Sequence, residues 1–271
     1  MIFRSYRPRQ PLSEWVESFW YWQSDSVVEA LARRLPTSSM EFVINLCEAP
    51  FRVYDPDDGD ICEQFKSALI CGPHSKASIS SASQAAIGVH FKPGGAFPFL
   101  RVPASELRDA HISFDSLWGK STTQLREQLL EAERPESMFF ILEHFMLQKV
   151  ARPLAHHPAV ALALAEFAKI PQTQPVSAVA KQTGLSQRRF IHLFSEEVGL
   201  TPKLFCRIQR FQTVLRLVKK TSPISWASVA TSCGYFDQAH LVHEFRAFSG
   251  LSPSVYLENR GDDINHVLIN S

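Results

Sequence analysis

The sequence predicts an α+β protein with a strand-rich N-terminal domain and an all-helical C-terminal domain. Short apolar runs punctuated by glycine and proline fill residues 1–118, and helical periodicity begins at Ser121. An internal repeat with a period of about 50 residues occupies the last third of the chain. The length of 271 residues suits two domains. We therefore divide the chain into an N-terminal domain (1–150), a linker (151–158), a helical domain (159–260) and a tail (261–271).

Three apolar runs predict strands at 42–46, 68–71 and 87–91, and the segment DPDDGD at 55–60 predicts a turn. After Ser121, we expect Leu125, Leu129 and Leu130 on one face of a helix. A second helical run follows at about 136–149, with an apolar set made of Phe139, Phe140, Leu142, Phe145 and Met146. Two prolines and few apolar residues mark 151–158 as the linker.

The composition is that of a soluble globular protein, because 45% of the residues are hydrophobic and 20% are charged. No apolar run approaches the roughly 18–20 residues that span a bilayer, and the N-terminus lacks the pattern of a signal peptide. We therefore expect a cytoplasmic protein. The five cysteines are odd in number and far apart. We expect reduced, mostly buried thiols rather than a disulfide framework or a zinc ribbon.

Charge is distributed unevenly along the chain. Residues 1–159 carry 16 Lys and Arg against 19 Asp and Glu, whereas residues 160–260 carry 12 against 6. A basic C-terminal third is typical of a domain that binds a polyanion, although a solvated basic face is the ordinary explanation. The positive charge therefore indicates a polyanion-binding surface only where it lies on a structural motif that exposes it.

The internal repeat is visible when the C-terminal third is compared with itself. The pattern VA-x-x-x-G at 179–184 recurs at 229–234, and GLTP at 199–202 recurs as GLSP at 250–253. An apolar pair four residues apart lies inside each copy, Phe190 with Phe194 and Leu241 with Phe245.

Each copy predicts a helix-turn-helix. Short helices are expected at 177–183 and 225–233, opened by serines, and Gly184 and Gly234 suit a turn with positive φ. Ser186 and Asp237 are placed to cap a second helix whose apolar pair faces inward. A long helix at about 204–218 joins the copies. Two helical hairpins packed for core reasons alone are the alternative.

The outward faces of the two second helices carry side chains that can hydrogen-bond base edges, arginine and glutamine with two bonds each. The predicted base-contact residues are Gln187, Arg188, Ile191, His192, Gln238, His240 and His243. Ile191 would make an apolar contact there, for example with a thymine methyl group. Basic residues and helix starts are the predicted phosphate contacts, namely Arg189, Thr201, Lys203, Arg210, Arg246 and Ser252.

The stretches VSAVAKQTGLSQRRFIHLFSEEVGLTPKLFCRIQRFQTVLRLV and SWASVATSCGYFDQAHLVHEFRAFSGLSPSVYL resemble the AraC/XylS-type transcription regulators. The resemblance covers about residues 160–258. It implies a seven-helix domain whose two helix-turn-helix units enter successive major-groove segments about 34 Å apart. Arg210 matches the arginine common in the linker helix of that family. Ile191 departs from the glutamine or arginine frequent at its position, so base preference cannot be copied from a relative.

The stretch GVHFKPGGAFPFLRVPASELRDAHISFDSLWG (88–119), with MEFVINL (40–46), resembles a sensor-like domain that precedes this module in an uncharacterised subset of the family. That resemblance implies a cupin-like β fold followed by helices, and it implies no ligand. A group of aromatic residues near the N-terminus could line an effector pocket, although such clusters are more often core. These residues are Trp15, Phe19, Trp20 and Trp22.

We expect neither a cofactor nor a catalytic site. His74 and His90 lack the neighbours that would complete a metal site, and KPGG at 92–95 lacks the order of a phosphate loop. No sequence context identifies a serine nucleophile. A basic, activating neighbour is also missing in the sequence around three cysteines, Cys47, Cys62 and Cys71.

These features predict a bacterial-type, sequence-specific DNA-binding transcription regulator with an N-terminal sensing or dimerisation domain. The expected partners are double-stranded promoter or operator DNA and RNA polymerase, with a small-molecule effector and a second copy of the chain as further candidates, and no membrane. The alternative is an enzyme for DNA repair or small-molecule modification fused to a DNA-binding module. A decayed DNA-binding half is disfavoured, because caps, turns and polar faces are intact in both copies.

Overall fold

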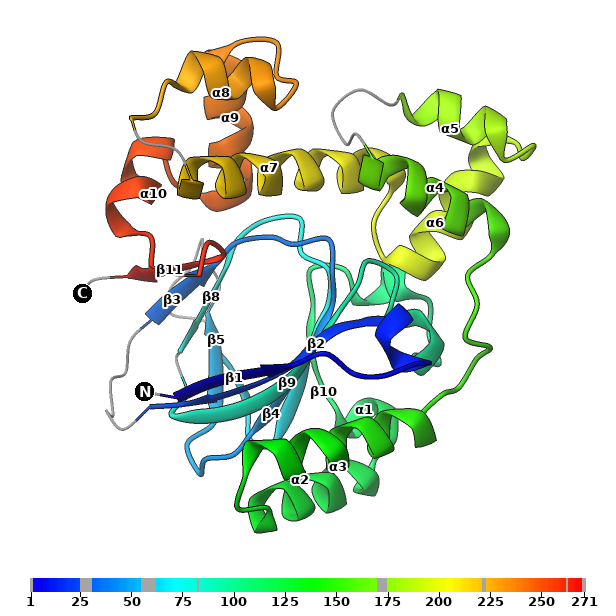
Figure 1. The fold of residues 1–271 in the computed structure, drawn as a ribbon, viewed down its shortest axis with the longest axis vertical. Helices are drawn as coiled ribbons and strands as arrows, with labels where there is room; N and C mark the ends of the chain where they lie inside the picture. The colour runs from blue at the N-terminus through cyan, green and yellow to red at the C-terminus, as the bar shows by residue number, and fades with distance from the viewer. Residues whose placement is uncertain are drawn as a thin grey trace.

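The computed structural model describes residues 2–24, 31–54, 62–81, 83–169, 175–220, 223–261 and 263–269. The N-terminal part forms two antiparallel sheets, and the C-terminal part is helical apart from one last strand (Figure 1). This arrangement confirms the predicted α+β class, while the cupin-like assignment stays a prediction. Among the described residues, no helix has both the length and the apolar character needed to cross a membrane.

All strand pairs in the two sheets are antiparallel. The larger sheet has, in spatial order, β1 (Ile2–Tyr6), β2 (Val16–Gln23), β9 (Ala85–Phe91), β4 (Glu41–Asn45), β7 (Ala68–Cys71) and β10 (His111–Ser113). The smaller sheet has β11 (His266–Ile269), β3 (Leu31–Arg34), β8 (Ser78–Ser81), β5 (Phe51–Tyr54) and β6 (Cys62–Phe65). The three predicted strands are confirmed as β4, β7 and β9, which are neighbours in the larger sheet. The predicted turn at 55–60 lies outside the described residues.

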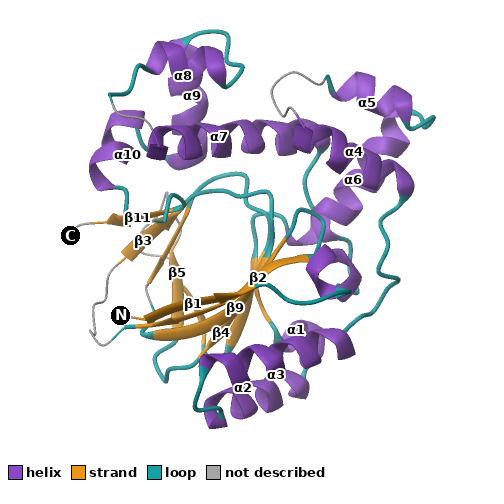
Figure 2. Cartoon of the chain, in the orientation of Figure 1, coloured by secondary structure: helices purple, strands orange, loops and turns teal. Residues whose placement is uncertain are grey.

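The central strands β9, β4 and β7 of the larger sheet are buried on both faces, which explains their apolar sequences. Successive side chains of a strand point to opposite faces, so Phe42 and Ile44 enter one hydrophobic core and Val43 enters another. The second core lies between the two sheets, where Val43 meets Phe51 and Val53 of β5. On the other face pack three helices, α1 (Asp115–Trp118), α2 (Lys120–Glu131) and α3 (Pro135–Gln148), which form the lower layer in Figure 2.

Two details of the predicted helical faces are wrong. Leu125 and Leu129 are buried in α2, but Leu130 is 46% exposed. In α3, Phe139 is buried and its neighbour Phe140 is 65% exposed. Adjacent helical residues differ by about 100° around the axis, which turns Leu130 and Phe140 away from the buried faces of their helices.

The described residues of the helical part form seven helices, the number that the family resemblance implies. They are α4 (Pro158–Lys169), α5 (Val176–Gln182), α6 (Gln187–Val198), α7 (Pro202–Lys220), α8 (Trp226–Ser232), α9 (Gln238–Ser249) and α10 (Pro253–Asn259). The long helix α7 crosses above the sheets, with α5 and α6 near one end and α8 and α9 near the other (Figure 1). One continuous hydrophobic core, which includes Phe211 of α7, holds these helices together.

Residues 261–271, predicted to be a tail, contain a strand that joins the smaller N-terminal sheet. This strand, β11, pairs with β3, with His266 opposite Arg34 and Ile269 opposite Leu31. Val267 of this strand is 2% exposed and belongs to the core of the helices, together with Leu35 and Ala77 from the N-terminal part. The two parts of the chain therefore share one sheet and one core.

Candidate nucleic-acid interface

Two helix-turn-helix units are built from α5 with α6 and from α8 with α9. Gly184 and Gly234 adopt positive φ values of 70° and 71° in the two turns, a conformation that glycine adopts without strain. The Ser186 hydroxyl accepts the backbone N–H of Arg189. The Asp237 carboxylate accepts the N–H of His240 at 2.7 Å. Both predicted caps of the second helices are confirmed.

The first helices of the two units begin differently. Ser225 caps α8 by accepting the N–H of Ser228, as predicted. The prediction that Ser177 opens α5 is wrong, because the helix begins one residue earlier and its cap position is Pro175, which makes no side-chain capping bond. Proline fixes φ near the helical value and needs no N–H partner at a helix start, so this helix begins without a serine cap.

The apolar pairs fix the rotation of α6 and α9. Phe190, Phe194 and Leu241 are completely buried, and Phe245 is 1% exposed. Residues on the opposite helical face must therefore point outward. This inward anchoring is what exposes the N-terminal turns of α6 and α9.

The outward face of α6 carries three of the four predicted base-contact residues in exposed positions. These are Gln187, Arg188 and His192. Ile191 is half-buried and packs against the core of the helices. An apolar contact by Ile191 is therefore restricted to the part of its side chain that remains accessible.

The outward face of α9 forms an open surface depression lined by Gln238, Ala239, Val242, His243 and Arg246. It brings two predicted base-contact residues together with one predicted phosphate contact. His240 is half-buried, and its Nδ1 accepts the N–H of Phe236 at 3.3 Å. This bond leaves Nε2 as the ring nitrogen that faces a partner.

Phe236 was not identified from the sequence. It is 91% exposed and lies in the turn directly before α9. A single exposed aromatic residue carries no periodic signal, so only its position beside α9 singles it out. Helices α6 and α9, the second helices of the two units, are the predicted recognition helices.

The predicted phosphate contacts occupy different environments. Arg189, Lys203 and Arg246 are exposed. The hydroxyl groups of Thr201 and Ser252 accept backbone N–H groups at the starts of α7 and α10. These two side chains act as caps, so any phosphate contact at these positions would involve the helix starts themselves.

Arginines of α7 hold the second unit in place. Arg210 donates from Nη1 to the carbonyl of Gly234 at 3.1 Å and lies over the Tyr235 ring, 4.8 Å from its centroid. Arg207 forms a two-bond pair with Glu244 of α9, with distances of 2.9 Å and 2.6 Å. The hydrogen bonds from Arg207 lower the pKa of Glu244. The joining helix is therefore bonded directly to the turn and to the recognition helix of the second unit.

Two family models match this chain. A helix-turn-helix domain model matches residues 179–259, and a model named Domain of unknown function (DUF6597) matches residues 4–113. The first match spans both turns, both recognition helices and α7. Residues 179–259 are therefore a helix-turn-helix domain. The match confirms the two helix-turn-helix units predicted from the repeat.

Individual relatives are similar to parts of the chain. An uncharacterized HTH-type transcriptional regulator of Haemophilus influenzae is 30% identical over 81 residues, which are 30% of this chain and 27% of that protein. The chain thus matches about a quarter of the length of this relative. ToxT of Vibrio cholerae O395 is 10% identical over 88% of this chain and 95% of its own, with a TM-score of 0.47. A DNA-binding transcriptional dual regulator of Escherichia coli K-12 is 23% identical over 38% and 94%, with a TM-score of 0.33.

The predicted aromatic pocket residues divide between the two faces of the larger sheet. Trp15 and Phe19 are buried in the core that packs against α2 and α3. Trp20 packs against the core between the sheets, and Trp22 donates from its indole to the carbonyl of Ser83 at 3.1 Å. The alternation of side chains along β2 causes this division. A pocket lined by all four residues together stays a prediction without support from this geometry.

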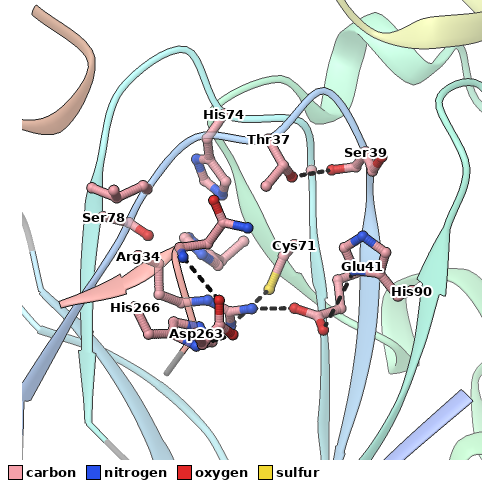
Figure 3. Close-up of a pocket in the computed structure, with 14 residues that line it drawn as sticks. Arg34, Thr37, Ser39, Glu41, Cys71, His74, Ser78, His90, Asp263 and His266 are labelled. Carbon is pink, nitrogen blue, oxygen red and sulfur yellow. Dashed lines mark hydrogen bonds and ion pairs between the residues drawn. The ribbon is translucent and has the colours of Figure 1, made fainter. Parts of the chain in front are cut away.

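A different cavity lies between the N-terminal sheets and the segment that follows α10 (Figure 3). Its volume is about 100 Å³. Its polar lining residues are Arg34, Thr37, Ser39, Glu41, His74, Ser78, His90, His111, Asp263, Asn265 and His266. The last three come from the segment after α10, so both parts of the chain line one cavity.

Electrostatics in this cavity are dominated by burial and by one ion pair. Arg34 is hydrogen-bonded to Glu41, and this pairing holds the pKa of the carboxyl group below its usual range despite burial. Burial lowers the pKa of His74 to about 4 and that of His111 to about 3. Their rings lie 4.6 Å apart. Both imidazoles are therefore neutral near pH 7, as expected for histidines removed from water.

The cavity has no complete metal site within the described part of the chain, where no group of three or more His, Cys, Asp or Glu is suitably arranged. Cys71 lies at 3.9 Å from Arg34, yet burial raises the pKa of its thiol to about 12. Cys206 and Cys233 also have raised pKa values because of burial. Such thiols remain protonated and are poor nucleophiles. The side chain of Cys62 lies outside the described residues.

Proposed function

We propose that this protein is a sequence-specific DNA-binding transcription regulator. The observation that carries the proposal is the pair of recognition helices, α6 and α9, whose capped N-terminal turns are exposed near opposite ends of α7 (Figure 1). A helix of 19 residues is about 28 Å long. This length is comparable to one turn of DNA, about 34 Å, so the two units suit successive major-groove segments.

In this mechanism, the basic helical domain approaches DNA through phosphate contacts, and the two recognition helices read base edges. The regulator would then act beside a promoter through RNA polymerase. A second copy of the chain is a further candidate partner, through the N-terminal domain.

Arg188→Ala is expected to weaken specific binding by about 1–3 kcal/mol and to relax the preference at one base pair, because an arginine can bond a guanine with two hydrogen bonds. The measurement is binding-site selection from random DNA, followed by sequencing, for both proteins. Arg216→Ala is a matched control, since it removes an exposed arginine of α7 outside the recognition helices. An unchanged set of selected sites for Arg188→Ala, with the same preference at every position, would contradict its assignment.

We also propose that the N-terminal domain controls DNA binding in response to an effector or a partner. The cavity supports this proposal, because its lining combines N-terminal residues such as Ser78 with Asp263 and His266, which follow the second unit. An occupant would contact both parts, and it regulates only if its affinity differs between two states of the protein.

A screen of small uncharged polar molecules is expected to yield compounds that raise the melting temperature of the full chain and change its operator affinity. Ser78→Val should remove the thermal shift by taking a hydrogen-bonding group from the cavity, whereas Ser254→Val on exposed α10 should retain it. A compound that stabilises wild type and Ser78→Val equally binds elsewhere. Stabilisation without any change in DNA affinity would contradict the sensing role, and chemical turnover of such a compound would favour the fused-enzyme alternative.

A further inference from the structure

One short segment of the N-terminal domain contacts both recognition helices. It comprises residues 72–77 and connects β7 in the larger sheet to β8 in the smaller sheet. Near its start, Pro73 packs on Gly199, the residue that ends α6. Near its end, the N–H of Ala77 donates to the carbonyl of Phe248 in α9 at 2.8 Å.

Both contacts fall at the C-terminal end of a recognition helix. Gly199 and Gly250 end the two recognition helices, with φ values of 85° and 71°. A Cβ atom at Gly199 would lie 2.6 Å from Cγ of Pro73 and 3.0 Å from the carbonyl oxygen of Ala104. At Gly250 it would lie 2.7 Å from Nη1 of Arg33. The N-terminal domain therefore holds both recognition helices at their C-terminal ends, opposite the turns that would face DNA.

The segment is itself anchored by one side chain. The Asp109 carboxylate accepts the backbone N–H of Ser75 at 2.5 Å and its hydroxyl at 2.8 Å. Asp109 has a φ of 57°, which aspartate rarely adopts and glycine adopts freely. Gly72 and His74 of the segment also line the cavity, as does Ser78, the first residue of β8. The segment thus touches the cavity and both recognition helices.

We propose that residues 73–77 are a positioning element that sets the placement of α6 relative to α9, and hence the spacing of the two half-sites that the protein reads. This inference rests on the proposed DNA-binding function. Helix α7 joins the two units and packs against both recognition helices. The anchored segment joins the C-terminal ends of both helices to the N-terminal sheets. A second unit held in place binds strongly at the matching spacing and weakly at any other.

The test uses the full chain with three variants. Asp109→Gly removes the anchor of Ser75 and suits the positive φ, so it loosens the segment without straining the backbone. Asp109→Asn retains an acceptor oxygen and tolerates this φ, so it should restore wild-type behaviour. Asp115→Ala is the matched control, because it removes another aspartate that accepts a serine hydroxyl, at the start of α1 on the far side of the larger sheet (Figure 1).

Affinities are measured for the selected operator, for the operator with one base pair inserted between the half-sites, and for each half-site alone. One inserted base pair rotates the half-sites by about 35° and separates them by about 3.4 Å. We expect wild type to lose about tenfold or more on this insertion and Asp109→Gly to lose about threefold or less. Asp109→Gly should bind the normal operator about 5–20-fold more weakly, with half-site affinities unchanged within about twofold. In the DNA-free protein, backbone amides in the last turns of α6 and α9 should exchange faster.

Two results would overturn the inference. An insertion penalty in Asp109→Gly equal to that of wild type would mean that α7 alone sets the spacing. An equal loss on the operator and on both half-sites would mean that the variant is only less stable. Failure of wild type to select any DNA sequence would instead remove the proposed function, and this inference with it.

Discussion

Lowering the pH from about 6.5 to about 5 is expected to reduce the free energy of unfolding by roughly 3–4 kcal/mol. The cause is the pair of neutral, buried imidazoles of His74 and His111, whose pKa values are lowered to about 4 and about 3. In the unfolded chain both groups titrate near pH 6.5. Below that pH the unfolded state binds protons that the folded state does not, so stability falls by about 1.4 kcal/mol per pH unit for each imidazole.

Between about pH 5 and pH 6.5, the effect of the two histidines on stability can be distinguished from the effects of the other groups whose pKa values are shifted. The pKa values of Glu41 and Asp263 are lowered, Glu41 by its pairing with Arg34 and Asp263 mainly by its hydrogen bond with His266. The stability that they contribute is present above about pH 4.5 and is lost only as the pH falls further. Burial alone would lower the pKa of His90, but the Glu41 carboxylate beside it raises that pKa above its usual value. Its contribution is fully present below its unfolded pKa, so it adds no slope between pH 5 and pH 6.5.

Denaturant unfolding at several pH values measures this effect. His111→Gln removes one of the two titrating groups and should reduce the slope by about half. His144→Gln makes the same substitution at an exposed position of α3, and it should leave the slope unchanged. A wild-type stability that stays level down to about pH 5 would show that the two imidazoles are not held neutral.

Raising the salt concentration from about 50 mM to about 200 mM is expected to weaken specific DNA binding by about 40- to 150-fold. Four of the predicted phosphate contacts are cationic, namely Arg189, Lys203, Arg210 and Arg246. Each phosphate neutralised releases about 0.9 counterion, so four contacts give a logarithmic slope near −3.6 and three give about −2.7. The slope of about −2.7 applies when Arg210 stays bonded to the Gly234 carbonyl and contacts no phosphate.

The measurement is the affinity of the full chain for its selected operator at several salt concentrations. The full chain is used because β11 pairs with β3 of the N-terminal domain, and a C-terminal fragment would leave this strand unpaired. Arg246→Ala should reduce the slope by about one. Arg210→Ala should leave the slope unchanged if its guanidinium is committed to the second unit. An affinity independent of salt would contradict the phosphate assignments as a group.

The helix-turn-helix units could be predicted from the sequence because their determinants are local. Ser186 and Asp237 cap helices three residues away, and Gly184 and Gly234 provide the φ values that the turns require. The apolar pairs at a spacing of four residues define the buried face of each recognition helix. Base and phosphate contacts remain predictions, since exposure shows which side chains are available and does not show what they bind.

The strands near the N-terminus were harder to predict, because alternation along one strand distributes its residues between two cores. Trp20 and Phe19 are adjacent in the sequence and lie on opposite faces of the larger sheet. A cluster of aromatic residues in sequence is therefore no indication of a common pocket when those residues are in a strand.

Local patterns in the sequence were enough to predict the two helix-turn-helix units, their turns and most of the side chains that the recognition helices expose. Contacts between distant segments were not predictable in this way: residues 266–269 form a strand beside β3, His74 and His111 become neutral neighbours, and residues 73–77 contact both recognition helices. The difference has a physical reason. Capping and helical periodicity act over three or four residues, whereas strand pairing and burial join segments such as His266 and Arg34 that are far apart in the chain.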